Sequence, residues 1–292
     1  MWSSIGPSRK IILSRKSREK MSYALSPNWD FSITVGINMK AVYQKKEFCK
    51  IWQYDTVSAM RLHRFYIDTP ISEDKFDITD RDLVHQWRSV FRYNVGSRVI
   101  LFDGAGVDYL VMITSLRSSG ASVGVVEKKN KNNKPKIDLW LCVGITKKDN
   151  FELVVQKATE LGVSNVVPVL CERSEKKNIN IERSRKIAIE SSEQSGRGSI
   201  PAVHEVVDLG SLLKSEILPE KKIFLQFGGQ YIGDFLQTEK PNELAVFVGP
   251  EGGFGDMEIK EFGENNIPSI SLGLQILRAE TAGIAVSSLL LL

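Results

Sequence analysis

The chain has 292 residues, enough for two ordinary domains, and 42% of them are hydrophobic, which excludes a wholly disordered protein. No apolar run approaches the roughly 18 to 20 residues that a membrane-spanning helix needs, so no membrane span is expected. The three cysteines and three histidines are scattered, without a CxxC pair or a cluster. This pattern predicts a cytoplasmic protein with neither a disulfide framework nor a metal site.

Charge is distributed unevenly along the chain. Residues 1–59 hold ten Lys/Arg against four Asp/Glu, and residues 60–136 hold thirteen against nine. Residues 137–292 hold sixteen Lys/Arg against twenty-two Asp/Glu. A basic front and an acidic back favour contact between the front and a polyanion such as nucleic acid, although a solvated surface with uneven charge has the same composition.

Residues 1–59 differ from the rest of the chain. The first twenty are rich in Ser, Lys and Arg and contain one acid, Glu19, a composition typical of a transit peptide. An upstream start codon is the alternative, and the favoured one, because the sequence from Met60 (MRLHRFY) has the character of a fresh N-terminus. Under either interpretation we expect this extension to be poorly ordered.

A β-rich unit begins at Met60, where short apolar runs separated by turn residues favour a small barrel or open sheet. Its strands are expected at residues 62–67, 98–102, 107–114 and 121–126. One amphipathic helix is expected over residues 82–93, with Asp82 as its N-cap, because apolar side chains recur there at helical spacing. The polar run KKNKNNKPK at residues 128–136 predicts an exposed linker, which ends this unit near residue 130.

Strands and helices alternate after the linker. Strands are expected at residues 137–145, 165–170, 223–227, 244–248 and 269–272. Helices are expected at residues 151–161, 181–193 and 257–262 and from Arg278 onward. This alternation predicts an α/β domain over residues 137–292, with a mostly parallel sheet covered on both faces.

Two glycine-bearing loops follow strands in this second unit. The first is GPEGG at residues 249–253, and the second lies within LGLQILRAETA at residues 272–282. Neither is a Walker A motif or a GxGxxG fingerprint. Each alone is more often a tight turn or a capped helix than a site. Together, at the carboxyl ends of strands in an open sheet, they predict a ligand cleft.

Two further motifs lie between these elements. ELVVQKATELGV at residues 152–163 has the pattern of an amphipathic helix that ends at a glycine. EQSGR at residues 193–197 is either a plain helix C-cap or a loop that presents Arg197 to a phosphate.

Five of these segments occur together in one order: QKATELGV, CERS at residues 171–174, EQSGR, GPEGGF and LGxxILRAETA. With the opening MRLHRFY, they resemble the RsmE family, the 16S ribosomal RNA uridine N3-methyltransferases of the SPOUT class. The resemblance covers residues 60–292. It implies a PUA-like RNA-binding β-barrel at residues 60–130, a SPOUT trefoil-knot α/β domain at 137–292, and a homodimer. It also implies a role in ribosome biogenesis, with S-adenosylmethionine as methyl donor and small-subunit RNA as partner.

Site residues follow from matching the family's motifs to this chain. The cofactor is expected at three loops, through Leu225, Phe227, Gly228, Val248, Gly249, Pro250, Glu251, Gly252, Gly253, Leu272, Gly273, Leu274, Ile276 and Leu277. Arg278 is the candidate that stabilises developing charge on the uracil, and Glu280 is the candidate general base, although both also suit a purely structural role. The RNA contacts are expected to be Arg61, Arg64, Arg92, Arg173 and Arg197.

The chain departs from the family's pattern at three places. Gln275 stands where the family usually has arginine, and Gly255 stands where it commonly has a serine helix cap. The closing helix stops early, at Leu292, which would weaken dimerisation or closure over a cofactor. Two alternatives stay open: a SPOUT methyltransferase that acts on transfer RNA or another ribosomal nucleotide, and a non-catalytic RNA-binding assembly factor, for which Gln275 and the short C-terminus leave room.

Overall fold

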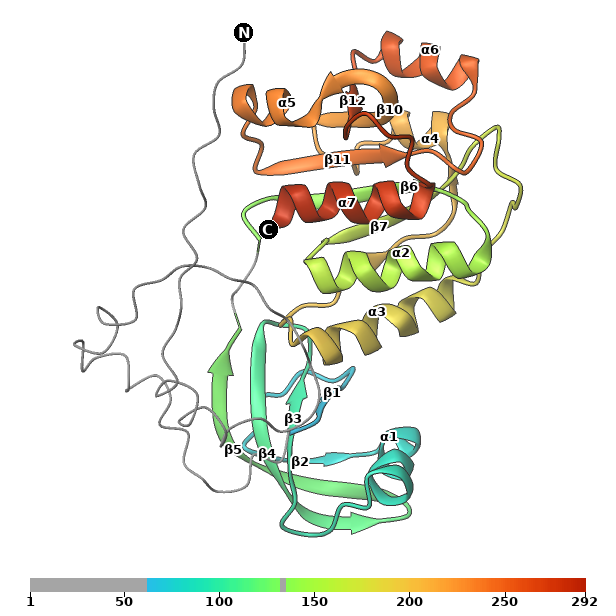
Figure 1. Cartoon of the computed structure of the whole chain (residues 1–292). Helices are drawn as coiled ribbons and strands as arrows, with labels where there is room; N and C mark the ends of the chain where they lie inside the picture. Colours follow the sequence, from blue (N-terminus) through green and yellow to red (C-terminus); the bar gives the residue numbers. More distant parts are fainter. Residues whose placement is uncertain (1–61, 132–134) are drawn as a thin grey trace, which may run out of the picture. The chain divides into compact units, whose positions relative to one another are not determined.

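The computed structural model describes residues 62–131 and 135–292, which lie within one compact unit that spans residues 60–292. The expectations for the extension at residues 1–59 and for Arg61 therefore lie outside the described residues. None of the described helices is long and apolar enough to cross a membrane. Figure 1 shows two sheets, which we call the five-stranded sheet and the seven-stranded sheet.

The five-stranded sheet has the strand order β1-β3-β4-β5-β2. Its strands are β1 (Arg64–Tyr66), β2 (Lys75–Ile78), β3 (Arg98–Phe102), β4 (Val107–Arg117) and β5 (Gly120–Asn130). β1 pairs with β3 in parallel, and the other neighbours are antiparallel. The predicted strand over residues 98–102 is confirmed to the residue. β2 was not predicted, because its four residues alternate too briefly to form a pattern.

The helix expected over residues 82–93 is shorter and irregular. A short α1 (Arg81–His85) continues as a π-helical turn, η3 (Gln86–Val90). The prediction of Asp82 as N-cap is wrong, since the carboxylate of Asp80 accepts hydrogen bonds from the backbone N–H of Asp82 and Leu83. The predicted buried face is confirmed at Leu83 and at Trp87, which is fully enclosed in the core of the five-stranded sheet, but it is wrong at Val90, whose side chain is 66% exposed.

The predicted linker over residues 128–136 begins too early. Residues 128–130 continue β5 and pair with residues 107–109 of β4. Their side chains are exposed, so backbone pairing overrides the polar composition. The chain then reaches the first strand of the seven-stranded sheet at Asp138.

The seven-stranded sheet has the order β12-β10-β11-β6-β7-β8, with β9 also paired to β7, and every pair is parallel. This confirms the predicted α/β class with a parallel sheet. The strands are β6 (Asp138–Gly144), β7 (Asn165–Leu170), β8 (Ala202–Val203), β9 (Val207–Asp208), β10 (Lys222–Tyr231), β11 (Glu243–Val248) and β12 (Ser269–Ser271).

Helices cover both faces of this sheet (Figure 1). They are α2 (Lys148–Leu161), α3 (Ile181–Ser195), α4 (Leu209–Lys214), α5 (Ile232–Thr238), α6 (Asp256–Glu264) and α7 (Ala279–Leu291). Side chains alternate along each strand, so that Leu141 and Val143 lie in one core with α2, α3, α5 and α7, whereas Cys142 lies in the other with α4 and α6. Burial raises the pKa of the Cys142 thiol, which keeps it neutral.

Candidate cofactor and RNA site

A cavity of about 570 Å³ opens between the middle of β10 and the carboxyl ends of β11 and β12. Three loops that are distant in the sequence form it, together with one side chain that follows β7. The lining residues are Arg173, Leu225, Gln226, Phe227, Val248, Gly249, Pro250, Glu251, Gly252, Gly253, Phe254, Ile259, Ile270, Ser271, Leu272, Gln275, Ile276, Leu277, Arg278, Ala279 and Ala282. The predicted cleft therefore exists, at the edge of the sheet where it was expected.

Most of the predicted cofactor residues line this cavity, but three do not. Gly228 lies beside it, in a neighbouring cavity of about 360 Å³ that shares Phe227. Gly273 and Leu274 are outside the lining, and the Leu274 side chain is 89% exposed. Gln226, Phe254 and Ile270 were missed, because a motif marks a loop but not which of its neighbours face inward.

The first lining loop interrupts β10. β10 pairs with β12 as far as Leu225 and again from Gln230, so residues 226–229 leave the ladder between two paired stretches. Gly228 has a φ of 81°. A Cβ on Gly229 would lie 2.7 Å from the carbonyl of Ser269. The excursion therefore needs glycine at both positions.

The GPEGG loop depends on a glycine that the sequence did not single out. A Cβ on Gly144, the last residue of β6, would lie 2.5 Å from the nitrogen of Pro250. The loop is held from the same side by Glu251, whose carboxylate accepts a hydrogen bond of 3.0 Å from the backbone N–H of Lys147. A glycine that closes an otherwise apolar strand was the available signal for this close approach.

The segment after β7 contacts the far end of the same loop. Arg173, 46% exposed, reaches the carbonyl of Gly252 and the carboxylate of Asp256, each at 3.3 Å. It thus lies at the cavity mouth as an accessible cation, and its predicted contact with RNA stays a prediction.

Gly255 is the N-cap of α6, as expected, but it has a second reason to be glycine. A Cβ there would collide with the carboxylate of Glu172. The two oxygens of Glu258 accept hydrogen bonds from the backbone N–H of Gly255 and Glu172, at 2.7 and 2.9 Å. Glycine instead of serine at position 255 therefore fits this chain, because Glu172 occupies the space of a side chain and Glu258 caps the helix.

Arg278 and Glu280 have different surroundings. Arg278 is the N-cap residue of α7, its exposed side chain lines the cavity, and it makes no side-chain hydrogen bond or ion pair within the described residues. Glu280 is 8% exposed, one carboxylate oxygen is buried without a partner in the described part of the chain, and it does not line the cavity. The structure therefore does not bring the predicted general base into the lining of the cavity.

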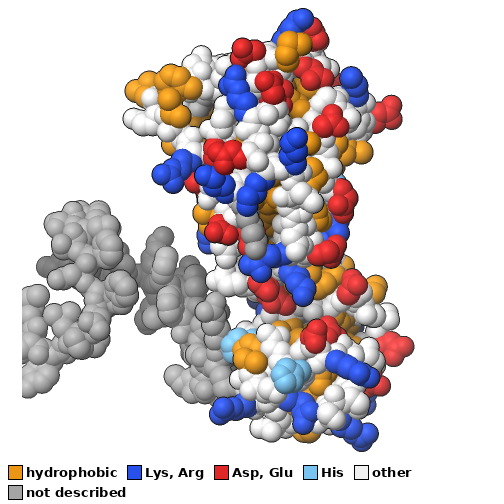
Figure 2. All heavy atoms as spheres, turned by 90° about the vertical axis from the view of Figure 1, so that its right-hand side faces the viewer, with side chains coloured by type: hydrophobic (Ala, Val, Ile, Leu, Met, Phe, Trp, Pro, Cys, Tyr) orange, Lys and Arg blue, Asp and Glu red, His pale blue; other side chains and the backbone are white. Residues whose placement is uncertain are grey.

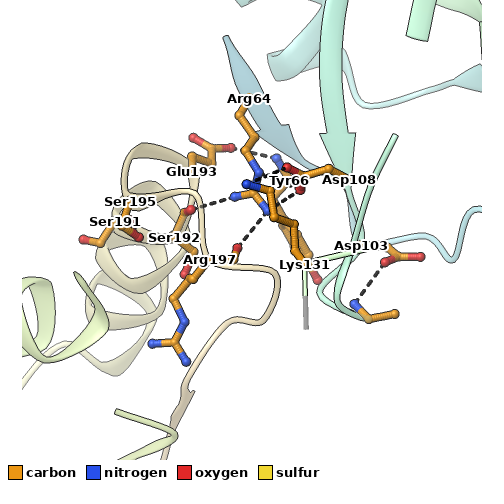
Figure 3. Close-up of polar contacts among 11 residues, drawn as sticks. Arg64, Tyr66, Asp103, Asp108, Lys131, Ser191, Ser192, Glu193, Ser195 and Arg197 are labelled. Carbon is orange, nitrogen blue, oxygen red and sulfur yellow. Dashed lines mark hydrogen bonds and ion pairs between the residues drawn. The ribbon is translucent and has the colours of Figure 1, made fainter. Parts of the chain in front are cut away.

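Arg64 is buried rather than presented to solvent (Figure 3). Its side chain and that of Asp108 are 6% and 7% exposed, with 2.7 Å between Nη2 and Oδ1. The guanidinium also donates 2.7 Å hydrogen bonds to the carbonyls of Ser192 and Arg197, and it stacks on Phe102 at 3.5 Å. The predicted RNA contact of Arg64 is therefore corrected, since its donors are already occupied.

Arg197 is also engaged inside the protein. Its Nη1 donates to the carbonyl of Thr159, in the last turn of α2, and to that of Val163, just after the helix, at 2.8 and 2.9 Å. Burial lowers its pKa to about 10, so it stays cationic at neutral pH. EQSGR is thus a C-cap, with Gly196 at a φ of 75°, and the predicted phosphate contact of Arg197 is corrected.

Arg92 remains an accessible candidate for RNA contact. It is exposed after η3 in a left-handed conformation, with a φ of 54°. Lys and Arg side chains on the face shown in Figure 2 are interspersed with Asp and Glu instead of forming one basic stripe. Within the described residues, no group of three or more His, Cys, Asp or Glu side chains has the geometry to hold a metal ion.

The chain matches known methyltransferases over its described length. The family model for an RNA methyltransferase domain matches residues 132–291. The ribosomal RNA small subunit methyltransferase E of Rickettsia conorii is 31% identical over 236 residues, covering 77% of this chain and 93% of the relative. The protein of that name from Bacillus subtilis is 30% identical, covering 71% of this chain and 86% of the relative.

Solved structures extend the likeness to the fold. A ribosomal RNA small subunit methyltransferase E from Neisseria gonorrhoeae, bound to S-adenosyl methionine, has a TM-score of 0.69 at 26% identity, over 78% of this chain and 96% of the other. A methyltransferase from Legionella pneumophila, in complex with the same cofactor, has a TM-score of 0.72 at 26% identity, over 79% and 97%. This chain belongs to the ribosomal RNA small subunit methyltransferase E family.

Proposed function

We propose that this protein transfers a methyl group from S-adenosylmethionine to N3 of one uridine in the 16S RNA of the small ribosomal subunit. The observation that carries this proposal is the cavity formed by the excursion within β10 and the loops after β11 and β12, in a chain of this family. Related proteins from Neisseria gonorrhoeae and Legionella pneumophila were solved with that cofactor.

The cavity fits this cofactor in size and chemistry. Its volume of about 570 Å³ lies within the roughly 300 to 1,000 Å³ of small-molecule sites. Apolar side chains, among them Leu225, Ile270 and Leu272, offer surfaces for a flat adenine ring. The peptide groups of residues 249–253 offer hydrogen bonds to its polar edges, because glycines leave that backbone uncovered.

Methyl transfer to uracil N3 needs positioning and removal of a proton. When bound, S-adenosylmethionine supplies a methyl group already activated by its sulfonium. Uracil N3 is protonated at neutral pH and is a poor nucleophile until that proton leaves. Holding the base in line contributes up to about 7–11 kcal/mol to the lowering of such a barrier.

Arg278 and Glu251 are placed to act on the base. Both line the cavity. We assign Arg278 to stabilise the negative charge that develops on the uracil oxygens, because its guanidinium keeps its donors free. Glu251 is the carboxylate among the lining residues, and its second oxygen is available to accept the N3 proton. Glu251 thus replaces Glu280 as the candidate base.

The proposal includes two features of the fold, a PUA-like barrel and a trefoil knot. The five-stranded sheet with α1 is proposed as a PUA-like RNA-binding barrel at residues 60–130, and residues 137–292 as a trefoil-knot domain. The segment after β12 supports the knot: it lines the cavity beside the β10 and β11 loops, and α7 then packs on α2 and β6, away from its own strand at the sheet edge. Because true knots are rare in proteins, a knotted path of the chain from β12 to α7 would be specific to the SPOUT class.

A homodimer in the cytoplasm also belongs to the proposal. Leu153 on α2 and Leu289 on α7 are 39% and 53% exposed, and α2 and α7 pack side by side. The loop residue Ile276 is 82% exposed beside the cavity. Such apolar side chains suit burial against a second copy. Analytical ultracentrifugation tests this point, with a monomer at micromolar concentration contradicting it.

Two measurements on the purified full chain test the function. Calorimetric titration with S-adenosylmethionine should show one site per chain. Incubation with labelled cofactor and undermethylated small subunits should then label the 16S RNA. If the protein binds the cofactor but labels transfer RNA instead of 16S RNA, a SPOUT methyltransferase with a transfer RNA substrate would be favoured. Absence of binding at millimolar cofactor would leave a non-catalytic assembly factor.

A further inference from the structure

Arg64 joins the two sheets through three acceptors on different elements. Asp108 lies on β4 of its own sheet, Ser192 is in the last turn of α3, and Arg197 follows that helix. We call these four residues the junction cluster. Because the carbonyls at a helix C-terminus carry partial negative charge, a buried arginine is favoured there.

Backbone contacts surround the junction cluster. The N–H of Tyr66 donates to the carboxylate of Glu193 at 2.8 Å, and the N–H of Gly106 donates to the carbonyl of Gly198 at 3.0 Å (Figure 3 shows the first pair of residues). A Cβ on Gly198 would lie 2.9 Å from the Cα of Gly106. The two sheets therefore meet at a fixed separation, with no room for side chains between these backbones.

The two sheets are otherwise independently built. The five-stranded sheet has its own core around Trp87, and the seven-stranded sheet has two cores of its own. The chain passes between them once, from β5 to β6. Within the described residues, the junction cluster and its neighbours add hydrogen bonds and an ion pair to this one covalent connection.

We propose that Arg64 is a positioning residue for methyl transfer. By fixing the five-stranded sheet on the end of α3, it sets where RNA held by that sheet presents its uridine relative to the cofactor cavity. This inference rests on the proposed function, and it assigns no contact between Arg64 and RNA. Since a misplacement of about 1 Å costs up to about 100-fold in rate, a loosened junction should lower turnover without loss of the cofactor site.

The test is single-turnover methylation of small subunits at saturating RNA, together with calorimetry of S-adenosylmethionine. Arg64→Ala should lower the transfer rate by about 100-fold and leave the cofactor Kd within about twofold, because the cavity lies in the other sheet. Arg64→Lys should resemble Arg64→Ala, since an ammonium cannot reach all three acceptors in the guanidinium geometry. Added methylguanidinium should partly restore Arg64→Ala.

Controls separate positioning from charge and from folding. Arg98→Ala removes an exposed arginine from the same sheet, and it should keep the wild-type rate and gain nothing from methylguanidinium. Asp108→Asn retains the shape of the cluster and should show a smaller loss of rate, which keeps the test valid if Arg64→Ala fails to fold.

Wild-type rates in Arg64→Ala and Asp108→Asn with intact cofactor binding would overturn the positioning role. A wild-type protein that does not methylate small-subunit RNA would instead overturn the proposed function.

Discussion

Two arginines of this chain, Arg64 in the junction cluster and Arg278 at the cavity, lie in opposite environments. Arg64 is 6% exposed and donates to a carboxylate and two carbonyls. Arg278 is exposed, lines the cavity and makes no side-chain hydrogen bond within the described residues. A cation with occupied donors fixes structure, whereas a cation with free donors can act on a ligand.

The same contrast separates the arginines that hold the fold together from those that are exposed and available to a ligand. Arg64 and Arg197 hold elements together, and their charge is compensated inside the protein. Arg92, Arg173 and Arg278 keep exposed guanidinium groups. Substitutions on each side of this division test it.

The largest effect is expected at the cavity. Arg278→Ala should reduce single-turnover methylation by about 10²–10³-fold, because it removes a preorganised donor for the developing charge on uracil. Arg278→Lys should lie between Arg278→Ala and wild type, since a point charge replaces the fork. A rate in Arg278→Ala above half that of wild type would remove Arg278 from the catalytic role.

Alanine substitutions of two glycines, Gly144 beside the cavity and Gly198 at the junction, allow a direct comparison of the two regions. Gly144→Ala forces a Cβ against Pro250, and overpacking of this kind costs about 1–3 kcal/mol. Calorimetry should then show weaker S-adenosylmethionine binding, by about tenfold or more. Gly198→Ala forces a Cβ against Lys131 and Gly106 instead, so it should leave cofactor affinity unchanged.

Gly263→Ala is the matched control for both substitutions, because nothing lies within 4 Å of its added Cβ. It should leave cofactor binding as in wild type. Equal loss of cofactor affinity in Gly144→Ala and Gly198→Ala would contradict the separation of the two regions.

Salt dependence of RNA binding distinguishes a phosphate contact from a buried arginine. Arg173→Ala should lower the slope of log K against log salt by about 0.7–0.9, the value of one phosphate contact. Arg64→Ala should leave that slope unchanged, because its charge is already paired with Asp108. The reverse result, measured by filter binding across a salt series, would return Arg64 to the RNA surface.

Gln275 offers a gain-of-function comparison at the cavity. It lines the cavity at a position where the resemblance to the family led us to expect arginine. Gln275→Arg should raise kcat/KM for small subunits by about tenfold or less, through one added charge-assisted contact of about 1.4 kcal/mol or less. A fall in kcat/KM would mean that the residues at the cavity mouth of this chain suit glutamine better than arginine at position 275.

The smallest effect is a pH dependence at the junction. Burial raises the pKa of Glu193, so the folded state binds more protons than the unfolded state just above the ordinary glutamate pKa. Stability therefore falls as pH rises through that window. Glu193→Gln should be more stable than wild type at neutral pH, by less than about 1 kcal/mol, and equal to it in acid. Denaturant unfolding at two pH values checks this sign.

Strands made of a continuous apolar run were predictable from the sequence, and short elements without such a run were not. The strands at residues 98–102 and 165–170 are confirmed to the residue, because continuous apolar runs bounded by turn residues mark them. β2, β8, β9, α4 and α5 were missed, since two to seven residues show too little of any period. The end of β5 was missed because partner strands, rather than its own polar residues, decide pairing.

The loops of the site were predictable, but the role of individual side chains was not. Glycines after strands indicated the cavity, and the family's motifs indicated its ligand. Nothing local distinguishes Arg64 from Arg173, because the burial of Arg64 depends on the end of α3, which lies more than 120 residues away in the sequence. Likewise, Glu280 lies two residues after Arg278 yet faces inward.

The most direct test of the central claim is mass mapping of methylated nucleotides in small-subunit RNA from cells that lack this gene. We expect loss of one N3-methyluridine, restored by the wild-type gene and not by Arg278→Ala. An unchanged set of methylated nucleotides in the deletion strain, or a lost modification that is not on uridine N3, would contradict the account.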